Sequence, residues 1–185
     1  MLRSAILALA GFFLLACGKE TVPKPAGELR LSYPAPNYRT FASSCPFSFE
    51  YSDFAKVDSG KEPCWYYINY PEMKAKVFIT YFPIRNDFQL HVKEAEKMVY
   101  EHTIKASAIQ TKSFRYPEAK VYGNFYELKG HSASNIQFYA TDSTRHFVTA
   151  NLYFNTRPKP DSLAPAIEYI KKDMLHMLDT FRWKP

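Results

Sequence analysis

The residue with the clearest chemical role in this sequence is Cys17. An apolar run from Ala5 to Ala16 precedes it, and Arg3 supplies one cation before that run. The run has the length and composition of a secretory signal and is too short for a permanent membrane-spanning helix. Leu14-Leu15-Ala16-Cys17 is typical of a bacterial lipobox, in which the cysteine thiolate accepts a diacylglycerol group. We expect cleavage before Cys17 and a lipid anchor on it; a chance cysteine after an ordinary signal peptide is the alternative.

The two other cysteines, Cys45 and Cys64, remain as an even pair once Cys17 carries lipid. An exported protein lies in an oxidising compartment, where such a pair typically forms a disulfide. Closing a loop of about twenty residues would contribute roughly 3 kcal/mol in the chain-entropy treatment. A zinc site would need two more ligands, and no histidine lies between Thr40 and Tyr70. We predict a structural disulfide, with two separate buried thiols as the alternative.

The richest cluster of polar side chains contains His131, Ser132, Asp142 and His146. These are the residue types of a serine hydrolase triad within sixteen residues. The Gly-x-Ser-x-Gly motif of such enzymes is missing, and Asp142-Ser143 has ordinary turn composition. We therefore predict no catalytic site, no metal and no cofactor. An envelope enzyme or small-ligand protein that uses these four residues is the alternative.

The charge pattern argues against nucleic acid as a partner. The 185-residue chain has a formal net charge of +6, which becomes +5 for the 169 residues left when residues 1–16 are removed with Arg3. The basic residues are scattered among acidic and apolar positions, without the stripe of a nucleic-acid footprint. No small-molecule substrate is expected either.

The elements that must position these residues follow from hydrophobic periodicity. Residues 17–40 contain four prolines and are predicted to be a tether. Residues 41–185 are predicted to form one domain. A helix is predicted from a stripe with alternating spacings of four and three, and a second helix from Ser162 to Phe181. The first stripe consists of Phe88, Val92, Ala95, Val99, His102, Ala106 and Ile109. Alternating apolar residues predict strands at 45–51, 65–70, 75–82, 120–129, 135–141 and 146–155.

This order predicts the α+β class, with an antiparallel β-sheet covered by two long amphipathic helices. The layout is similar to the PsbP/Mog1-like α/β/α sandwich, which by itself implies no function.

Many separated stretches, in order and behind a lipobox, resemble the gliding-motility lipoprotein D (GldD) family of Bacteroidota. They include Cys45-Pro46-Phe47, Cys64-Trp65, Lys74-Ala75-Lys76, Glu101-His102, Lys120-Val121-Tyr122-Gly123, Gln137-Phe138-Tyr139, Thr141-Asp142-Ser143, His146-Phe147 and Asp161-Ser162-Leu163.

The resemblance implies a non-catalytic envelope lipoprotein that is needed for gliding motility and for the associated type IX protein secretion system. Its expected partners are the membrane, through the lipid anchor, and protein components of that apparatus. Gly18 after Cys17, where Asp would signal inner-membrane retention, favours the outer membrane, with the domain facing the periplasm. A PsbP-like assembly factor with many transient clients is a further alternative.

Overall fold

The structure, a computed structural model, describes residues 33–101, 106–156 and 160–184. All of them belong to the unit formed by residues 31–185. The predicted signal peptide (residues 1–16), Cys17 and most of the predicted tether lie outside the described residues. Within the described ranges, no helix is both long and apolar enough to cross a membrane.

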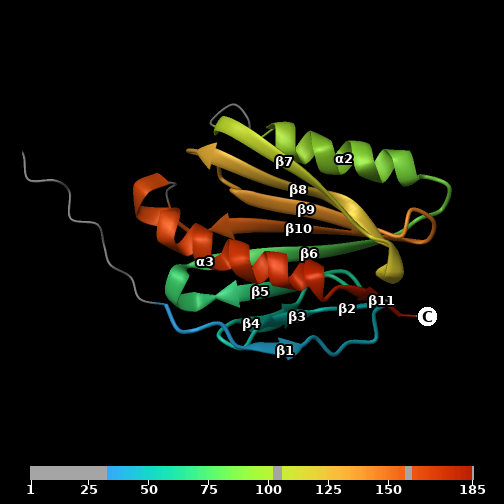
Figure 1. Ribbon diagram of the computed structural model, residues 1–185, viewed down its shortest axis with the longest axis horizontal. Helices are drawn as coiled ribbons and strands as arrows, with labels where there is room; N and C mark the ends of the chain where they lie inside the picture. Colours follow the sequence, from blue (N-terminus) through green and yellow to red (C-terminus); the bar gives the residue numbers. More distant parts are fainter. Residues whose placement is uncertain (1–32, 102–105, 157–159, 185) are drawn as a thin grey trace, which may run out of the picture. The chain divides into compact units, whose positions relative to one another are not determined.

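The fold is built on a seven-stranded antiparallel sheet with the order β4-β5-β6-β10-β9-β8-β7 (Figure 1). Its strands are β4 (Lys56–Ser59), β5 (Tyr66–Tyr70), β6 (Ala75–Pro83), β7 (Ala106–Tyr116), β8 (Val121–Gly130), β9 (Ile136–Thr141) and β10 (His146–Phe154). Every residue of β9 is buried, because this central strand is covered on both faces.

Two small sheets accompany the large one. β1 (Tyr38–Thr40) pairs with β3 (Glu50–Ser52), and β2 (Phe47–Ser48) pairs with β11 (Arg182–Trp183). The second pairing joins residues that are more than a hundred positions apart in the sequence. It therefore ties the C-terminal end of the chain to the start of the domain.

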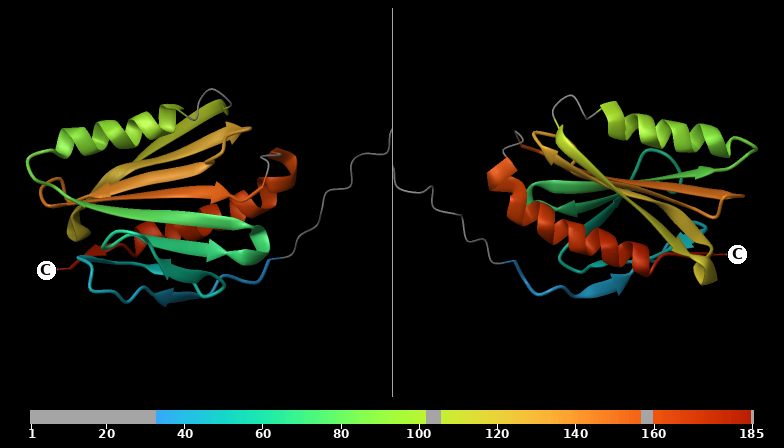
Figure 2. Two further views of the ribbon diagram at one scale, coloured as in Figure 1. Left: turned by 180° about the vertical axis from the view of Figure 1, so that it is seen from behind. Right: turned by 45° about the horizontal axis from the view of Figure 1, so that its top comes forward.

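The two α-helices of the described chain, α2 (Phe88–Glu101) and α3 (Pro160–Asp179), pack on opposite faces of the large sheet (Figure 2). α3 buries Ala166, Ile170, Met174, Met177 and Leu178, which recur at helical spacing. α2 buries only Val99 fully. The sheet face beneath α3 therefore carries the larger core.

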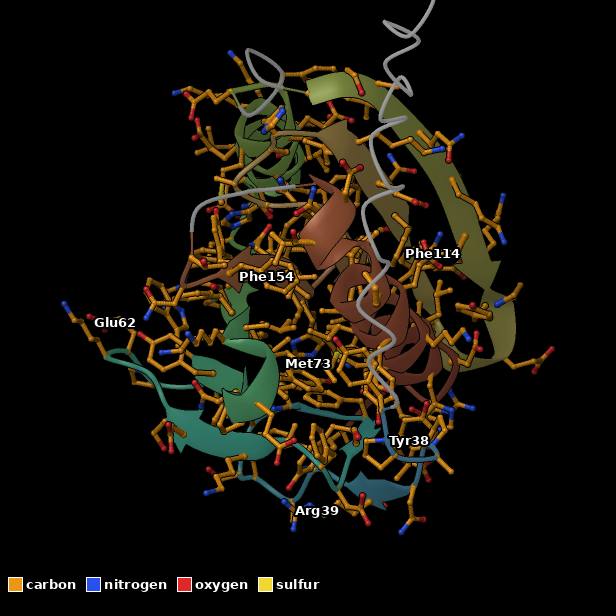
Figure 3. All side chains as sticks on the ribbon, turned by 90° about the vertical axis from the view of Figure 1, so that its left-hand side faces the viewer. Tyr38, Arg39, Glu62, Met73, Phe114 and Phe154 are labelled. Atoms are coloured by element: carbon orange, nitrogen blue, oxygen red, sulfur yellow. A yellow bond between two sulfur atoms is a disulfide. The ribbon has the colours of Figure 1, made fainter. Side chains whose placement is uncertain are left out.

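The side of α3 also holds one buried carboxylate, Asp173. Its two oxygens accept hydrogen bonds from the Tyr38 and Tyr70 hydroxyls, each at 3.1 Å. Tyr38 reaches α3 from β1 (Figure 3) and stacks on His176, with ring centroids 3.6 Å apart. Burial raises the pKa of Asp173, although the two tyrosine hydrogen bonds oppose that shift.

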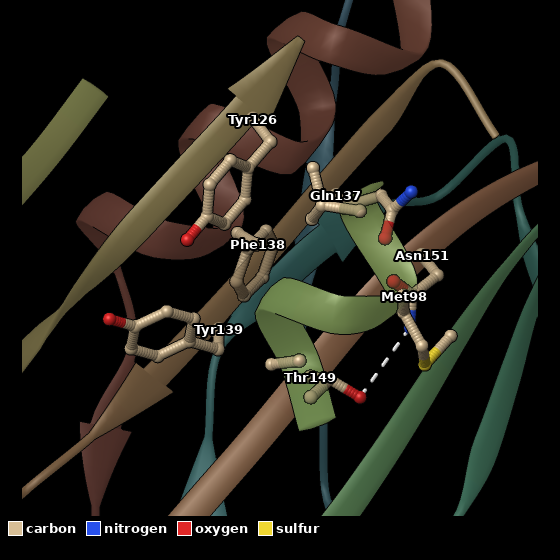
Figure 4. A pocket seen from close by; sticks show the side chains of 9 residues that line it. Met98, Tyr126, Gln137, Phe138, Tyr139, Thr149 and Asn151 are labelled. Atoms are coloured by element: carbon tan, nitrogen blue, oxygen red, sulfur yellow. Dashed lines mark hydrogen bonds between the residues drawn. The ribbon is translucent and has the colours of Figure 1, made fainter. Parts of the chain in front are cut away.

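The face beneath α2 contains polar as well as aromatic residues. Tyr126 and Tyr139 lie there with Gln137, Thr149 and Asn151, around a cavity of about 10 Å³ (Figure 4). A space of that size holds roughly one water molecule. The cavity is a packing feature, far too small for an organic ligand.

Two hairpins of the large sheet use the same turn, which the sequence repeats as Tyr-Pro-Glu-x-Lys. Pro71–Met73 (η2) connects β5 to β6, and Pro117–Ala119 (η4) connects β7 to β8. Each is a single 3-10 turn that ends at a lysine in the left-handed region, with φ of 50° at Lys74 and 51° at Lys120. The repeated sequence therefore gives both hairpins the same turn geometry.

The predicted α+β class, with a PsbP/Mog1-like α/β/α sandwich, is wrong: α2 and α3 lie on opposite faces of the sheet, but strands and not helices make up most of the fold. Strands account for 44% of the described residues and helices for 27%, so the fold is mostly β. The predicted first helix ends at Glu101 rather than continuing to Ile109, and Ala106–Tyr116 is a strand instead. The side of α3 is also shared with β1, β2, β3 and β11, and α3 packs against β3 as well as against the large sheet.

The missed strand has a physical explanation. Among the strands that the structure describes, β7 lies at the edge of the sheet and pairs only with β8, and most of its side chains are exposed. An exposed edge strand shows little hydrophobic alternation, and its stability comes from backbone hydrogen bonds to the neighbouring strand. Hydrophobic periodicity in the sequence gives no sign of those backbone bonds, so it did not predict this strand.

Candidate functional site

The four residues of the predicted polar cluster do not meet. His131 and Ser132 follow β8, whereas Asp142 and His146 flank the hairpin between β9 and β10. These two connections lie at opposite ends of β9, and a six-residue strand spans about 20 Å. Ser132 therefore cannot act with His146 as a nucleophile and its base.

Three members of the cluster, Ser132, Asp142 and His146, also have local structural roles. Ser132 is 1% exposed, and its hydroxyl donates to the Ser134 carbonyl oxygen at 2.8 Å. Asp142 Oδ1 accepts the backbone N–H groups of Thr144, Arg145 and His146 at 2.8–2.9 Å. Burial alone would raise the pKa of Asp142, but these N–H groups lower it below its usual value. Asp142 is thus the charged centre of a tight hairpin turn.

His146 is held between two aromatic residues. Its Nδ1 atom lies 2.9 Å from the Tyr81 hydroxyl, and its ring stacks on Trp183 with centroids 5.2 Å apart. Burial lowers the pKa of His146, partly opposed by the nearby charge of Asp142. The imidazole therefore serves as a packing group at the base of the hairpin.

The predicted disulfide is present. Cys45 and Cys64 are bonded, with 5.6 Å between their Cα atoms and a sequence separation of 19. The bond joins the segment before β2 to the segment before β5 and borders the core beneath α3. Within the described residues, no group of three or more His, Cys, Asp or Glu side chains could hold a metal ion.

The surface beside the β9–β10 hairpin is hollowed into what we call the hairpin groove. It consists of two adjoining hollows, of about 300 and 290 Å³, that share Glu118, Ala119 and Arg182. The first extends to Arg115, Tyr116, Pro117 and Asp179, and the second to Lys120, Asp142, Arg145, Trp183 and Lys184. The groove thus brings together η4, the hairpin, the end of α3 and β11.

Trp183 forms a fixed wall of the hairpin groove. Its indole Nε1 donates to the Lys120 carbonyl oxygen at 3.0 Å, and its ring meets Phe181 edge-on with centroids 4.8 Å apart. At the other end of the groove the Tyr116 hydroxyl donates to Asp179 Oδ1 at 2.7 Å. Burial and this carboxylate raise the pKa of Tyr116 to about 12, so the phenol stays protonated.

Sequence reasoning missed the hairpin groove because its residues come from three separated segments of the chain, around residues 115–120, 142–145 and 179–184. The Tyr-Pro-Glu-x-Lys repeat was the one usable signal, since it marks the turn that places Glu118 and Lys120.

Residues 18–183 match the family described as gliding motility lipoprotein GldD, the family that the sequence resembles. No curated protein matches the chain.

Proposed function

Because the chain belongs to the gliding motility lipoprotein GldD family, we propose that it is a non-catalytic, membrane-anchored accessory component of the gliding apparatus and of the associated type IX secretion system. The family match carries this proposal, since it spans residues 18–183 of 185. Membership of a lipoprotein family means association with the cell envelope. We further propose the outer membrane, with the domain facing the periplasm.

The anchor in this proposal is Cys17, with residues 17–40 as the tether that lets the domain reach its partners. Labelled palmitate should be incorporated into the protein and be lost in the variant Cys17→Ser. Equal labelling of the wild type and the variant would remove the lipid anchor from the proposal.

The geometry supports a non-catalytic role. Ser132 and His146 lie at opposite ends of β9, and Asp142 is committed to the hairpin turn. The hairpin groove, by contrast, presents arginine, tyrosine and tryptophan side chains, the types that most often dominate binding between proteins. Both observations favour binding over catalysis.

The test is an affinity pull-down of the lipidated protein from gently crosslinked cells, read by mass spectrometry. Stoichiometric recovery of gliding or type IX components is expected, and the same pull-down with Cys17→Ser should recover less. Recovery of the protein alone, or of scattered exported clients, would contradict the accessory role and favour an enzyme or an assembly factor.

A further inference from the structure

We propose that the hairpin groove binds an acidic, extended peptide segment of a protein partner. Its arginine and lysine side chains would bind the carboxylates of that segment beside Trp183. This inference deepens the accessory role, because it rests on that role and names the chemistry of one surface that would serve it.

The lining of the hairpin groove has an excess of positive charge. Arg115, Lys120, Arg145, Arg182 and Lys184 contribute five cations, against the three carboxylates of Glu118, Asp142 and Asp179. The excess lies in the second hollow, where Lys120, Arg145, Arg182 and Lys184 face two carboxylates, whereas the first hollow has two charges of each sign. A groove of one predominant sign attracts ligands of the opposite sign.

Two of the three carboxylates are already engaged within the fold. The Asp142 side chain is 7% exposed and accepts three backbone N–H groups, while Asp179 accepts the Tyr116 hydroxyl. Both keep their negative charge, because these donors are neutral, but the five cations of the groove still outnumber its three carboxylates. The Arg145 side chain is 71% exposed, and its Nε lies 4.0 Å from Asp142 Oδ2, at the limit of an ion pair.

Arg182 and Lys184 are positioned by neutral acceptors instead of carboxylates. Arg182 Nη1 donates to the Phe181 and Asp179 carbonyl oxygens, and Lys184 Nζ donates to the Ser43 carbonyl oxygen at 2.6 Å. Carbonyl groups orient these cations without cancelling their charge. Arginine in particular suits carboxylates, because its planar guanidinium can donate two parallel hydrogen bonds.

The wall of the groove is already in place before a ligand arrives. Trp183 is held by its hydrogen bond to the Lys120 carbonyl oxygen and by ring contacts with His146 and Phe181. A side chain fixed in this way loses little conformational freedom on binding, which favours affinity. The two adjoining hollows form an elongated depression, which fits an extended chain better than a compact small molecule.

The place where the described chain begins favours a protein segment over the anchoring membrane. Tyr33 packs against Tyr169 of α3, with ring centroids 5.0 Å apart. Asp179, in the hairpin groove, lies ten residues further along α3, which is roughly 15 Å along the helix axis. Tyr169 lies at the middle of α3, so the groove, at the C-terminal end of the helix, is about 15 Å along the axis from the place where Tyr33 contacts α3.

Trp183 supplies a built-in reporter for the test. The chain has two tryptophans, and the other, Trp65, does not line the groove. In purified full-length lipoprotein carrying Trp65→Phe, held in detergent micelles, we would titrate a peptide of alternating Glu and Ser. Saturable change of the Trp183 fluorescence is expected, and a peptide with Gln in place of Glu should produce none.

The rim variant Arg115→Glu/Arg145→Glu should weaken binding of the Glu-Ser peptide by about tenfold or more. The matched control is Lys56→Glu/Lys93→Glu, which makes the same change of net charge at exposed positions outside the groove. Thermal melts of both variants would establish that each is folded, and the control should bind as the parent does.

Several outcomes would overturn the inference: no response to the Glu-Ser peptide, equal weakening by the two variants, or equal binding of the Gln-Ser peptide. A response of Trp183 to vesicles of anionic lipid without a response to the peptide would assign the groove to a membrane surface instead. If the peptide fails but the pull-down recovers gliding components, the accessory role stands without this groove. If the peptide binds and the pull-down recovers none, the groove stands and the accessory role falls.

Discussion

The two faces of the seven-stranded sheet differ in chemistry although they belong to the same strands. In β10, Val148, Ala150 and Leu152 are buried on the side of α3, whereas Thr149 and Asn151 alternate with them on the side of α2. Alternation along a strand sends successive side chains to opposite faces. One strand therefore supplies an apolar face to one helix and a partly polar face to the other.

The helices match the faces they cover. α3 contributes a continuous apolar stripe to a large core, and α2 contributes one fully buried residue, Val99, to a small one. Apolar burial is the dominant favourable contribution to folding. The side of α3 should therefore carry most of the stability, and the side of α2 should tolerate change.

A matched pair of leucines tests this difference most directly. Leu152 (0% exposed) lies beneath α3 and Leu128 (1% exposed) lies in the cluster beneath α2. Leu152→Ala should lower the free energy of unfolding by about 4 kcal/mol and Leu128→Ala by about 2–3 kcal/mol, because α2 can settle into the space while the larger core cannot. Denaturant unfolding of both variants measures the two values, and equal losses would show that the faces are equivalent.

The disulfide should reinforce the side of α3 alone. Replacing both cysteines, as Cys45→Ala/Cys64→Ala, should lower the free energy of unfolding by roughly 3 kcal/mol, because the unfolded chain is no longer constrained. Hydrogen exchange should accelerate in residues 41–55 and stay unchanged in α2. A matching acceleration in α2 would mean that the two sides unfold as one unit.

Asp173 is a buried carboxylate in the core beneath α3. The direction of its effect on stability as the pH changes follows from its raised pKa. Burial raises its pKa above the usual 3.8, so the native state holds the proton longer than the unfolded state does. This group therefore makes the protein less stable as the pH rises from about 4 through the folded pKa. The variant Asp173→Asn should lack that decline, and its stability relative to the wild type should improve as the pH rises.

Asp142 provides a control, because its effect on stability should change with pH in the opposite direction. Its pKa is lowered in the fold, so its contribution to stability is present above 3.8 and is lost as the pH falls through the folded pKa. The free energy of unfolding of the variant Asp142→Asn should therefore fall relative to that of the wild type as the pH rises. Unfolding curves across the acid range measure both trends, and trends of the same sign would contradict the assignment.

Local pattern was enough to find most of the strands. The predicted strands at 75–82 and 146–155 correspond to β6 (Ala75–Pro83) and β10 (His146–Phe154), and the hairpin at Asp142 was also predicted. The helix that begins at Phe88 was predicted, but its end was not, because Ala106 and Ile109 continue the helical spacing by chance. Pairing with β8 overrides that spacing, since ten of the eleven residues of β7 have a partner in β8.

The disulfide could be predicted because it depends on counting: with one cysteine assigned to lipid, two remained for the oxidising compartment that the signal sequence predicts. The hairpin groove could not. Arg115, Arg145 and Arg182 carry no local signal that relates them, and they meet only because β11 pairs with β2 and η4 turns back toward the hairpin.

Taken alone, the sequence predicted a lipid anchor at Cys17, determined which two cysteines remain to pair, and showed which segments alternate as strands, because these depend on composition and on spacing within a few residues. The tertiary structure decided which helix covers which face, that the polar cluster is divided between the two ends of β9, and that five cations share one groove. These outcomes depend on contacts between residues far apart in the chain. Such contacts stabilise the fold only when they outweigh the entropy cost of bringing distant segments together.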